Sequence, residues 1–386
     1  MKQLNLVLSK RFQNYHPFLS LKTRLSRQLV PALSLLAALA GAVAVSAQTV
    51  ITFDAPGAGT GAGQGTYPFN ISPSGTTVGF VRDADDVRHG FLRTANGDFT
   101  VFDAPGAGTA GGQGTRAYSA NPSGTITGFF IDTVGGAHGY VRYADGAITV
   151  FDVPGAIATF PIFSPLLINP MGQITGYYLD ANGLPNGFLR ETDGTFATFA
   201  VAGADQGTYP FAISQRGDIT GYYIDGAGVN HGFLREKNGT ITTFDVPGAG
   251  TALGQGTLGG GFTASGVIIG NYYTPDNISH GFLRDKFGNF TSYDAPGAGS
   301  VPDSDQGTFP FGVNPAGATS GFYVDESEVS HGYVRGPQGH FFTFDVPGAG
   351  TGPGQGTQVY GIAPNGASTG FFLDPESVVH GVVVTK

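Results

Sequence analysis

The stretch Phe244-Asp245-Val246-Pro247-Gly248-Ala249-Gly250-Thr251 recurs in close copies along the chain, and the same series of motifs follows each copy. These motifs are an aromatic-Pro-Phe stretch, an Asn/Ser-Pro-x-Gly turn, a Gly-Phe/Tyr-Tyr/Phe-x-Asp stretch and a His-Gly-Phe-Leu-Arg stretch. Because a regular period is a better guide than chain length, the 386 residues indicate one continuous repeat array. The His-Gly-aromatic landmark recurs every 45 to 51 residues, at His89, His138, Asn186, His231, His280, His331 and His380.

Each unit contains four short apolar stretches separated by Gly, Pro and Asn turn residues, which predicts four β-strands. A four-stranded unit of about 40 to 50 residues is typical of a β-propeller blade, and the alternative is an open β-solenoid. In the first unit the strands are expected at Tyr67–Ile71, Thr76–Arg82, Arg88–Arg93 and Asp98–Asp103.

The ends of the repeat favour the propeller. The last unit stops at Val382–Lys386, after its third strand, whereas Val50–Asp54 has the sequence of a fourth strand without the other three. An open solenoid needs polar capping repeats, and the sequence shows none. We therefore expect an all-β, seven-bladed β-propeller of four-stranded blades, closed by the N-terminal strand pairing into the last blade.

The composition agrees with many short strands and tight turns. Gly (64 residues) and Pro (24 residues) are frequent, and aromatic and charged residues make up 12% each, which is unlike a disordered chain. The chain has no Cys, so a hydrophobic core rather than disulfides must hold the fold.

Residues 1–47 carry six basic residues, no acidic residue and an uncharged apolar run from Leu29 to Ala47. This pattern predicts a secretory signal peptide, and an uncleaved membrane anchor is the alternative. Residues 48–386 then form the single propeller domain, which is secreted or held in the cell envelope. Without the six basic residues the net charge changes from −9 to −15. Nucleic acid is therefore not expected as a partner, and a membrane is expected to be contacted only through the N-terminal segment, if uncleaved.

In a four-stranded blade, the connection to the next blade and the connection between the second and third strands lie on one face. This loop-rich face would carry the Pro-Gly-Ala-Gly-Thr to Gln-Gly-Thr loops and the loops that begin at Asp83, Asp132, Asp180, Asp225, Asp325 and Asp374. The opposite face, here the turn face, would show only Pro-x-Gly and Asn-Gly turns. Because binding sites concentrate on loops held by a rigid scaffold, the loop-rich face is the expected binding surface.

The Gly-x-Ile-x-Gly-Phe/Tyr stretch followed by His-Gly-Phe-Leu resembles the extracellular repeat family named for its His-Ala-Phe (HAF) motif. The resemblance covers all the units, with Gly in place of the Ala at nearly every copy. It implies a secreted bacterial repeat protein, and it brings no activity or catalytic residue with it.

Three side chains recur in the motif positions. The repetition of the His favours a structural role over a metal or acid–base role, and we expect His231, for instance, to bond near Asp245 or to a backbone carbonyl. The Arg and Asp that end the third and fourth strands are expected to form ion pairs, with a substrate-binding arginine as the alternative. The residues are His89, His138, His231, His280, His331 and His380; Arg93, Arg142, Arg190, Arg235, Arg284 and Arg335; and Asp54, Asp103, Asp152, Asp245, Asp294 and Asp345.

Two sets of residues are candidates for ligand binding. The Gln of each Gln-Gly-Thr copy either knits the loops together through its amide or offers a polar ring to a ligand. The third unit lacks Gln-Gly-Thr, and there Phe160 and Phe163 either form an exposed apolar ligand patch or pack in the core. The glutamines are Gln64, Gln113, Gln206, Gln255, Gln306 and Gln355.

The acidic loop clusters, such as Asp83, Asp85 and Asp86, lack the alternating pattern of a calcium loop. We expect solvated loops, with calcium as the alternative and no other cofactor. The function expected is that of a non-catalytic binding or scaffold protein for an extracellular polymer or an envelope protein. The alternatives are a secreted hydrolase or lyase with its site at the mouth of the central channel, and a cell-surface structural protein. Apart from His340, no singular His, Ser or carboxylate pair stands outside the repeated motifs of residues 48–386, so no catalytic residue is assigned.

Overall fold

A computed structural model of the protein describes residues 49–161 and 164–385. These residues form 28 β-strands joined by turns and loops, so the fold class is all-β, as the sequence predicts. No helix within these two ranges is long and apolar enough to cross a membrane. The predicted signal segment, residues 1–47, lies outside the described residues.

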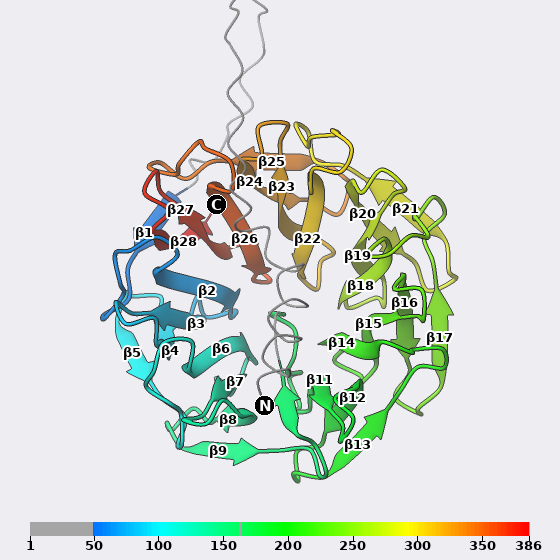
Figure 1. The fold of residues 1–386 in the computed structure, drawn as a ribbon. Helices are drawn as coiled ribbons and strands as arrows, with labels where there is room; N and C mark the ends of the chain where they lie inside the picture. The colour runs from blue at the N-terminus through cyan, green and yellow to red at the C-terminus, as the bar shows by residue number, and fades with distance from the viewer. Residues whose placement is uncertain (1–48, 162–163, 386) are drawn as a thin grey trace, which may run out of the picture. The chain divides into compact units, whose positions relative to one another are not determined.

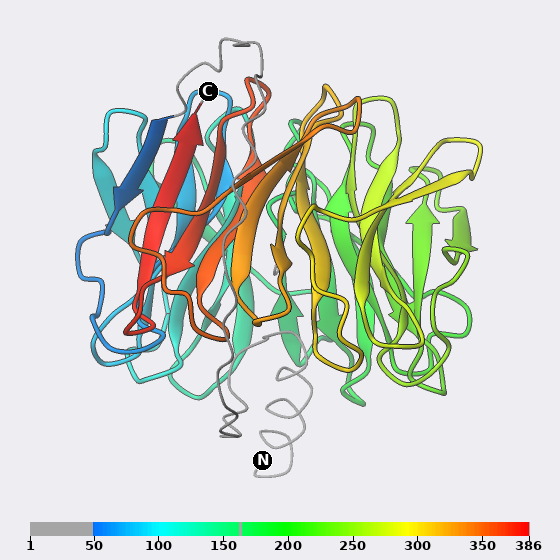
Figure 2. The same ribbon diagram turned by 90° about the horizontal axis from the view of Figure 1, so that it is seen from above.

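The strands form antiparallel groups of four, which Figure 1 shows around a common centre and Figure 2 shows after a quarter turn. The first group is β2 (Gly65–Ile71), β3 (Thr77–Arg82), β4 (Arg88–Arg93) and β5 (Phe99–Phe102). The second is β6 (Gly114–Ala120), β7 (Ile126–Ile131), β8 (Ala137–Arg142) and β9 (Ile148–Phe151), and the third is β10 (Ala158–Phe160), β11 (Ile174–Leu179), β12 (Pro185–Arg190) and β13 (Phe196–Phe199). The fourth is β14 (Gly207–Ile213), β15 (Ile219–Ile224), β16 (Asn230–Arg235) and β17 (Ile241–Phe244), and the fifth is β18 (Gly256–Phe262), β19 (Ile268–Tyr273), β20 (Ser279–Arg284) and β21 (Phe290–Tyr293). The sixth is β22 (Gly307–Val313), β23 (Thr319–Val324), β24 (Ser330–Arg335) and β25 (Phe341–Phe344).

The two ends of the described chain lie side by side. The last three strands, β26 (Gly356–Ile362), β27 (Ser368–Leu373) and β28 (Val379–Thr385), pair in chain order. Strand β28 also pairs with β1 (Thr49–Phe53) and with the start of β2. The N-terminal strand is therefore hydrogen-bonded to the last strand of the chain.

The first strand of a group lies nearest the centre and the fourth lies outermost (Figure 1). Exposure increases in the same direction. In the first group, the residues of the second strand, β3, are buried up to the last position, whereas the two middle residues of the fourth strand, β5, are exposed. The hydrophobic core lies between neighbouring groups. Val81 and Phe91 of the first group, for example, pack against Phe53 and Ala55, which precede that group in the chain.

The Gln-Gly-Thr motif shapes the passage between groups. Gly114 has a φ of +92°, and a Cβ atom there would lie 2.1 Å from the carbonyl oxygen of Arg88 in the preceding group, so Gly is required. The hydroxyl of Thr115 accepts the N–H of Ala104 at 2.9 Å. The N–H of Arg88 donates to the carbonyl of Gln113 at 3.1 Å, so the motif latches one group to the next.

The third group departs from this pattern. Its strands β10–β13 pair only with one another, whereas the other described strands form one continuous pairing. Pro185 stands where Arg88 stands in the first group and has no N–H, so the latch to the fourth group is missing. Thr159 still accepts the N–H of Val153 at 3.1 Å, although no Gln-Gly precedes it.

Candidate functional site

The two kinds of loop that the sequence places on one face lie against each other. The N–H of Gly59, in the loop that leads into β2, donates to the carbonyl of Arg82 at the end of β3 (3.0 Å). The next such loop also contacts the first group, because the N–H of Gly112 donates to the carbonyl of Asp86 (2.9 Å). In five of the described loops a backbone N–H is bonded in this way to the preceding group, whereas the loops that lead into the third and fourth groups have no such bond among the described contacts, so most of the loop-rich face is a fixed surface.

The amides of the repeated glutamines lie inside this loop network. Gln255 accepts the N–H of Ala252 at 3.1 Å through Oε1 and donates Nε2 to the carbonyl of Pro275 at 2.9 Å, and its side chain is buried. Gln306 is 1% exposed and accepts the N–H of Val301 at 3.0 Å. These bonds match the knitting alternative rather than an open polar ring. The same loop N–H or carbonyl contacts are made by Gln64, Gln113, Gln206 and Gln355.

Five of the six copies of the repeated His bridge two carboxylates, and His280 contacts one, Asp294. In His231, Nδ1 lies 3.0 Å from Asp245 at the end of the fourth strand, and Nε2 lies 3.4 Å from Asp225 at the start of the loop between the second and third strands. Asp245 is thus the partner of His231, which was one of the two alternatives expected from the sequence. The Nδ1 contacts span 2.7 to 3.0 Å and pair His89, His138, His280, His331 and His380 with Asp103, Asp152, Asp294, Asp345 and Asp54.

The neighbouring carboxylates raise the pKa of His89, His138, His231 and His331. A neutral imidazole has one N–H to donate, whereas the protonated ring donates from both nitrogens and so satisfies both partners. The hydrogen bond with Asp345 accordingly raises the pKa of His331, against the opposing effect of partial burial. Burial would lower the pKa of His231, but the bonds with Asp245 and Asp225 outweigh it and raise the pKa.

The third group supports a structural role for this arrangement. Asn186 stands there in place of the His, and Ala200 stands in place of the Asp that would receive its Nδ1–H. The amide of Asn186 instead donates to the carbonyl of Leu184 at 3.1 Å. Both partners of the pair are thus replaced together, as expected if each serves the other.

The expected ion pairs between the repeated Arg and Asp residues are wrong. Arg235 lies opposite Ile241, at the start of the fourth strand. Asp245 follows Phe244 at the other end of that strand, and Phe244 lies opposite Gly232. The guanidinium of Arg235 instead stacks on the ring of Phe199 from the preceding group, with Cζ 5.0 Å from the ring centroid. The same stacking, at 4.6 to 5.0 Å, is made by Arg93 on Phe53, Arg142 on Phe102, Arg190 on Phe151, Arg284 on Phe244 and Arg335 on Tyr293.

The apolar segment of the third group is not an exposed patch where it is described. Phe160 is 6% exposed, and its ring packs on Phe129 and Tyr177. Phe163 lies outside the described residues. The exposed-patch hypothesis is therefore wrong for Phe160, because its strand turns this side chain into the aromatic core.

The segment after Phe160 reaches across to other groups. The carbonyl of Pro165 accepts hydrogen bonds from Asn70 in β2 and from Ser119 in β6, both at 2.8 Å. The carbonyl of Leu166 accepts the N–H of Ile213 in β14 at 3.0 Å. Since these are the innermost strands of three different groups, the segment occupies the centre between them (Figure 1).

The acidic loops are organised by their own backbone. Asp83 accepts the N–H groups of Asp85 and Val87 at 2.9 and 2.8 Å, which closes the loop between β3 and β4. Within residues 49–161 and 164–385, no group of three or more His, Asp or Glu side chains is arranged to hold a metal ion.

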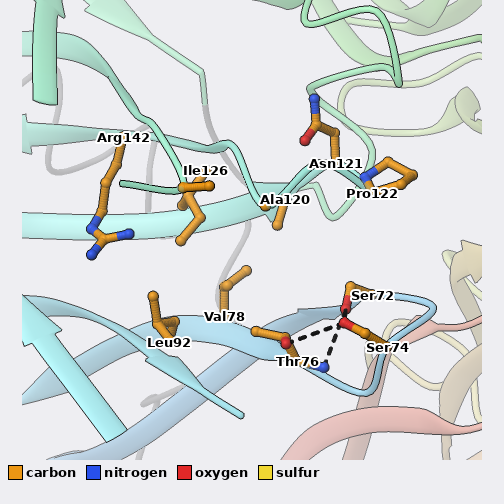
Figure 3. A pocket seen from close by; sticks show the side chains of 12 residues that line it. Ser72, Ser74, Thr76, Val78, Leu92, Ala120, Asn121, Pro122, Ile126 and Arg142 are labelled. Carbon is orange, nitrogen blue, oxygen red and sulfur yellow. Dashed lines mark hydrogen bonds between the residues drawn. The ribbon is translucent and has the colours of Figure 1, made fainter. Parts of the chain in front are cut away.

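Two cavities lie on the turn face, between adjacent groups. Figure 3 shows the one between the first and second groups, with a volume of about 160 Å³, where Ser72 and Thr76 face Asn121 and Arg142. The other, of about 220 Å³, lies at the equivalent place between the second and third groups. Ligand pockets usually have about 300 to 1,000 Å³. These cavities follow from the packing of repeated turns, and they carry no assignment of a site.

Sequence reasoning missed three arginines on the loop-rich face. Arg82 ends β3, Arg88 begins β4 and Arg116 lies in β6, and all three are half-buried. The signal was present in the sequence, because these positions are mostly apolar, aromatic or uncharged in the other units. The prediction of site residues was based on the His, Arg and Asp positions that recur in most units, and these three arginines do not recur.

Comparison with protein-family models gave no match. Comparison with curated proteins gave none either.

Several solved structures are similar in fold. A catalytically inactive virginiamycin B lyase from Staphylococcus aureus with quinupristin matches with a TM-score of 0.54 and 13% identity, over 88% of this chain and 100% of that chain. A prolyl endopeptidase matches with a TM-score of 0.52 and 14% identity, over 79% of this chain and 45% of that chain. A lectin from Burkholderia pseudomallei matches with a TM-score of 0.46 and 13% identity, over 76% of this chain and 93% of that chain. At this identity the likeness shows the fold alone, and that fold is a repeat β-propeller.

Proposed function

We propose that this protein is a secreted, non-catalytic binding module of the HAF-repeat type, whose loop-rich face holds an extracellular polymer. The proposal includes a propeller of seven blades, in which β1 completes the last blade. Its support is the pairing of β1 with β28 and the contact of Asp54 with His380 at 2.9 Å, which repeats the His–Asp contact made inside five of the other groups. A signal peptide at residues 1–47 would deliver the domain to the cell exterior.

The observation that carries the binding proposal is the fixed loop network. Six of the described loops, all but the one that leads into the third group, are held by backbone bonds and by a Gln amide, so the loop-rich face presents polar groups in fixed positions, which lowers the cost of ordering them on binding. The repeated His, Asp and Arg side chains are occupied by one another or by aromatic rings. Pro165 and Leu166 lie at the centre, where the alternative of a hydrolase or lyase would place its site.

A polymer is favoured over an envelope protein by the distribution of apolar side chains. Val134, Ile157, Leu253 and Val301 are the large apolar residues exposed in the described loops of the loop-rich face, at 88%, 48%, 78% and 44% exposure, and none of them is aromatic. Protein interfaces have an apolar core enriched in aromatic residues, which these loops do not expose.

The test is binding of the purified protein to an array of neutral and acidic polysaccharides and envelope polymers, with and without calcium. We expect a specific, saturable interaction with one polymer class. Binding of an envelope protein alone, turnover of a polymer, or a blank array together with a stable fold would overturn the proposal in favour of the other partner, an enzyme or a structural protein.

A further inference from the structure

Three arginines gather where the loop-rich faces of the first and second groups meet. Arg82 and Arg88 lie directly opposite each other in the pairing of β3 with β4. Arg88 in turn lies opposite Gly114 in β6, two residues before Arg116. The three side chains therefore come from adjacent strands of neighbouring groups, and they are called the arginine cluster here.

Asp86 and Gly112 connect the three guanidinium groups. Arg82 Nε lies 2.9 Å from a carboxylate oxygen of Asp86, and Arg88 Nη1 donates to the carbonyl of Asp86 at 3.2 Å. The same carbonyl accepts the N–H of Gly112 at 2.9 Å, and the carbonyl of Gly112 accepts Arg116 Nη2 at 2.8 Å. The cluster is thus held together by one short network.

The charges in this network are not balanced. Like charges directly opposite each other on paired strands are destabilising, yet Arg82 and Arg88 occupy such positions. Asp86 forms an ion pair with Arg82, and in the described part of the chain no carboxylate lies within ion-pair distance of Arg88 or Arg116. Burial and then the charge of Arg82 lower the pKa of Arg88, and burial and then the charge of Arg88 lower the pKa of Arg116 to about 9. Both groups remain cationic at neutral pH.

Donors of the cluster remain open to a ligand. A guanidinium has five N–H donors, and Arg88 uses one of them, to the carbonyl of Asp86, within residues 49–161 and 164–385. Arg116 donates to the carbonyls of Gly112 and Gly114, at 2.8 and 3.5 Å, and its guanidinium lies 4.9 Å over the ring of Phe129. Arg88 Nε and Nη2 and Arg116 Nε have no partner within the two described ranges and are not among the buried atoms without one, so these three nitrogens reach accessible space.

The cluster is not needed for the fold of a blade. Other units carry Ser279 or Ser330 at the position of Arg88, and Tyr67 or Tyr209 at the position of Arg116. Those units form the same strands and, at Ser279 and Ser330, the same latch between groups. The other basic residues of the described chain lie in or next to the turns of the opposite face, namely Arg93, Arg142, Arg190, Arg216, Arg235, Lys237, Arg284, Lys286 and Arg335.

We infer that the arginine cluster binds a single anionic group, a carboxylate or a phosphate, carried by the saccharide polymer of the proposed function. The inference rests on that function and names the chemistry of its ligand. Guanidinium groups bind carboxylate and phosphate oxygens through paired, charge-assisted hydrogen bonds. A polymer with many negative charges is disfavoured, because the loops of the same face carry Asp83, Asp132, Asp225, Asp325 and Asp374. Screening over about 8 Å at physiological salt leaves one local anion largely free of that repulsion.

The test compares three oligosaccharides of equal length, one neutral, one with a terminal uronate and one with a terminal phosphate, by titration calorimetry on the purified protein. The variants are Arg88→Ser and Arg116→Tyr, alone and together, because these residues occur at the same positions in other units. Arg216→Gln, an exposed position on the turn face, is the control for a changed net charge. We expect an acidic ligand to bind at least about tenfold more tightly than the neutral one, and the double variant to lose this preference while the control keeps it.

The comparison between the uronate and the phosphate identifies the source of the anion. Equal affinity for neutral and acidic ligands, or a preference that survives in the double variant, would overturn the inference while leaving the proposed function in place. If no saccharide binds, the proposed function fails, and the cluster is judged on free glucuronate and inorganic phosphate. Binding of either probe that disappears in the double variant would then support the anion site, and binding of neither would refute it.

Discussion

The pairing of the two chain ends makes a quantitative prediction for Phe53. Its ring packs on Phe99 with centroids 5.8 Å apart, lies 4.8 Å from Cζ of Arg93, and covers Gly381 of β28 so closely that a Cβ atom there would lie 2.4 Å from the ring. The ring is half-buried, so its loss in Phe53→Ala removes about half the transfer free energy of a Phe, together with an aromatic pair and a cation–π contact. These contributions amount to about 2 to 3 kcal/mol of unfolding free energy.

Two further variants make the measurement specific. Phe102 makes the same contact with Arg142 inside a continuous stretch of chain, at 4.9 Å, so Phe102→Ala should cost about the same. Ile51 is 37% exposed, and Ile51→Ala should cost less than about 1 kcal/mol. The assay is urea unfolding followed by intrinsic fluorescence and circular dichroism. A loss for Phe53→Ala no larger than that for Ile51→Ala, beside a full loss for Phe102→Ala, would refute the reasoning, because the ring of Phe53 would then contribute no packing between β28 and the first group.

Three other perturbations follow from the described contacts. Because the pKa of His331 is raised in the folded state, its protonation stabilises the fold at pH values below the usual His pKa of 6.5, and this stabilisation is lost as the pH rises through the higher folded pKa. The urea midpoint should therefore fall as the pH rises above about 6.5, and it should fall less in His331→Asn. A double-mutant cycle between Arg235 and Phe199 should give a coupling of about 0.5 to 1 kcal/mol in urea unfolding, and a coupling near zero would contradict the stacking. In Gly261→Ala the new Cβ would lie 2.6 Å from Leu166 Cδ1, so thermal unfolding should show that the free energy of unfolding falls by about 1 to 3 kcal/mol. The second substitution Leu166→Ala should partly restore it, and a double variant whose effects simply add would argue against this contact.

The repeated parts of the fold were predictable because they repeat. The all-β class, the strands of the first unit and the position of the loops follow from turn residues and alternating apolar stretches, and the structure has strands at these places. The contact of His231 with Asp245 was one of two that the sequence left open, and the register of the hairpin, which places both residues at the same end, decides for it. The pairing of Arg235 was not predictable, since antiparallel strands place it at the far end from Asp245, next to an aromatic ring of another group.

The parts that depend on contacts between distant units were out of reach of the sequence. The burial of Phe160 depends on rings from the second and third groups, and the bonds of Pro165 reach β2 and β6. The arginine cluster was visible as three departures from the repeat, but its significance depends on the junction that brings β3, β4 and β6 together. Periodicity identifies what units share, whereas binding specificity depends on where they differ.

The most direct test of the central claim uses the absence of Cys in the chain. Ala84 is exposed in a loop of the loop-rich face and Ala95 is exposed in a turn of the opposite face, so each can be changed to Cys and coupled to a bulky polyethylene glycol maleimide. The measurement is the affinity of each labelled protein for the polymer selected by the array. A binding module that uses its loop-rich face should lose binding when residue 84 is labelled and keep it within about twofold when residue 95 is labelled. Loss of binding only after labelling at residue 95 would contradict the claim.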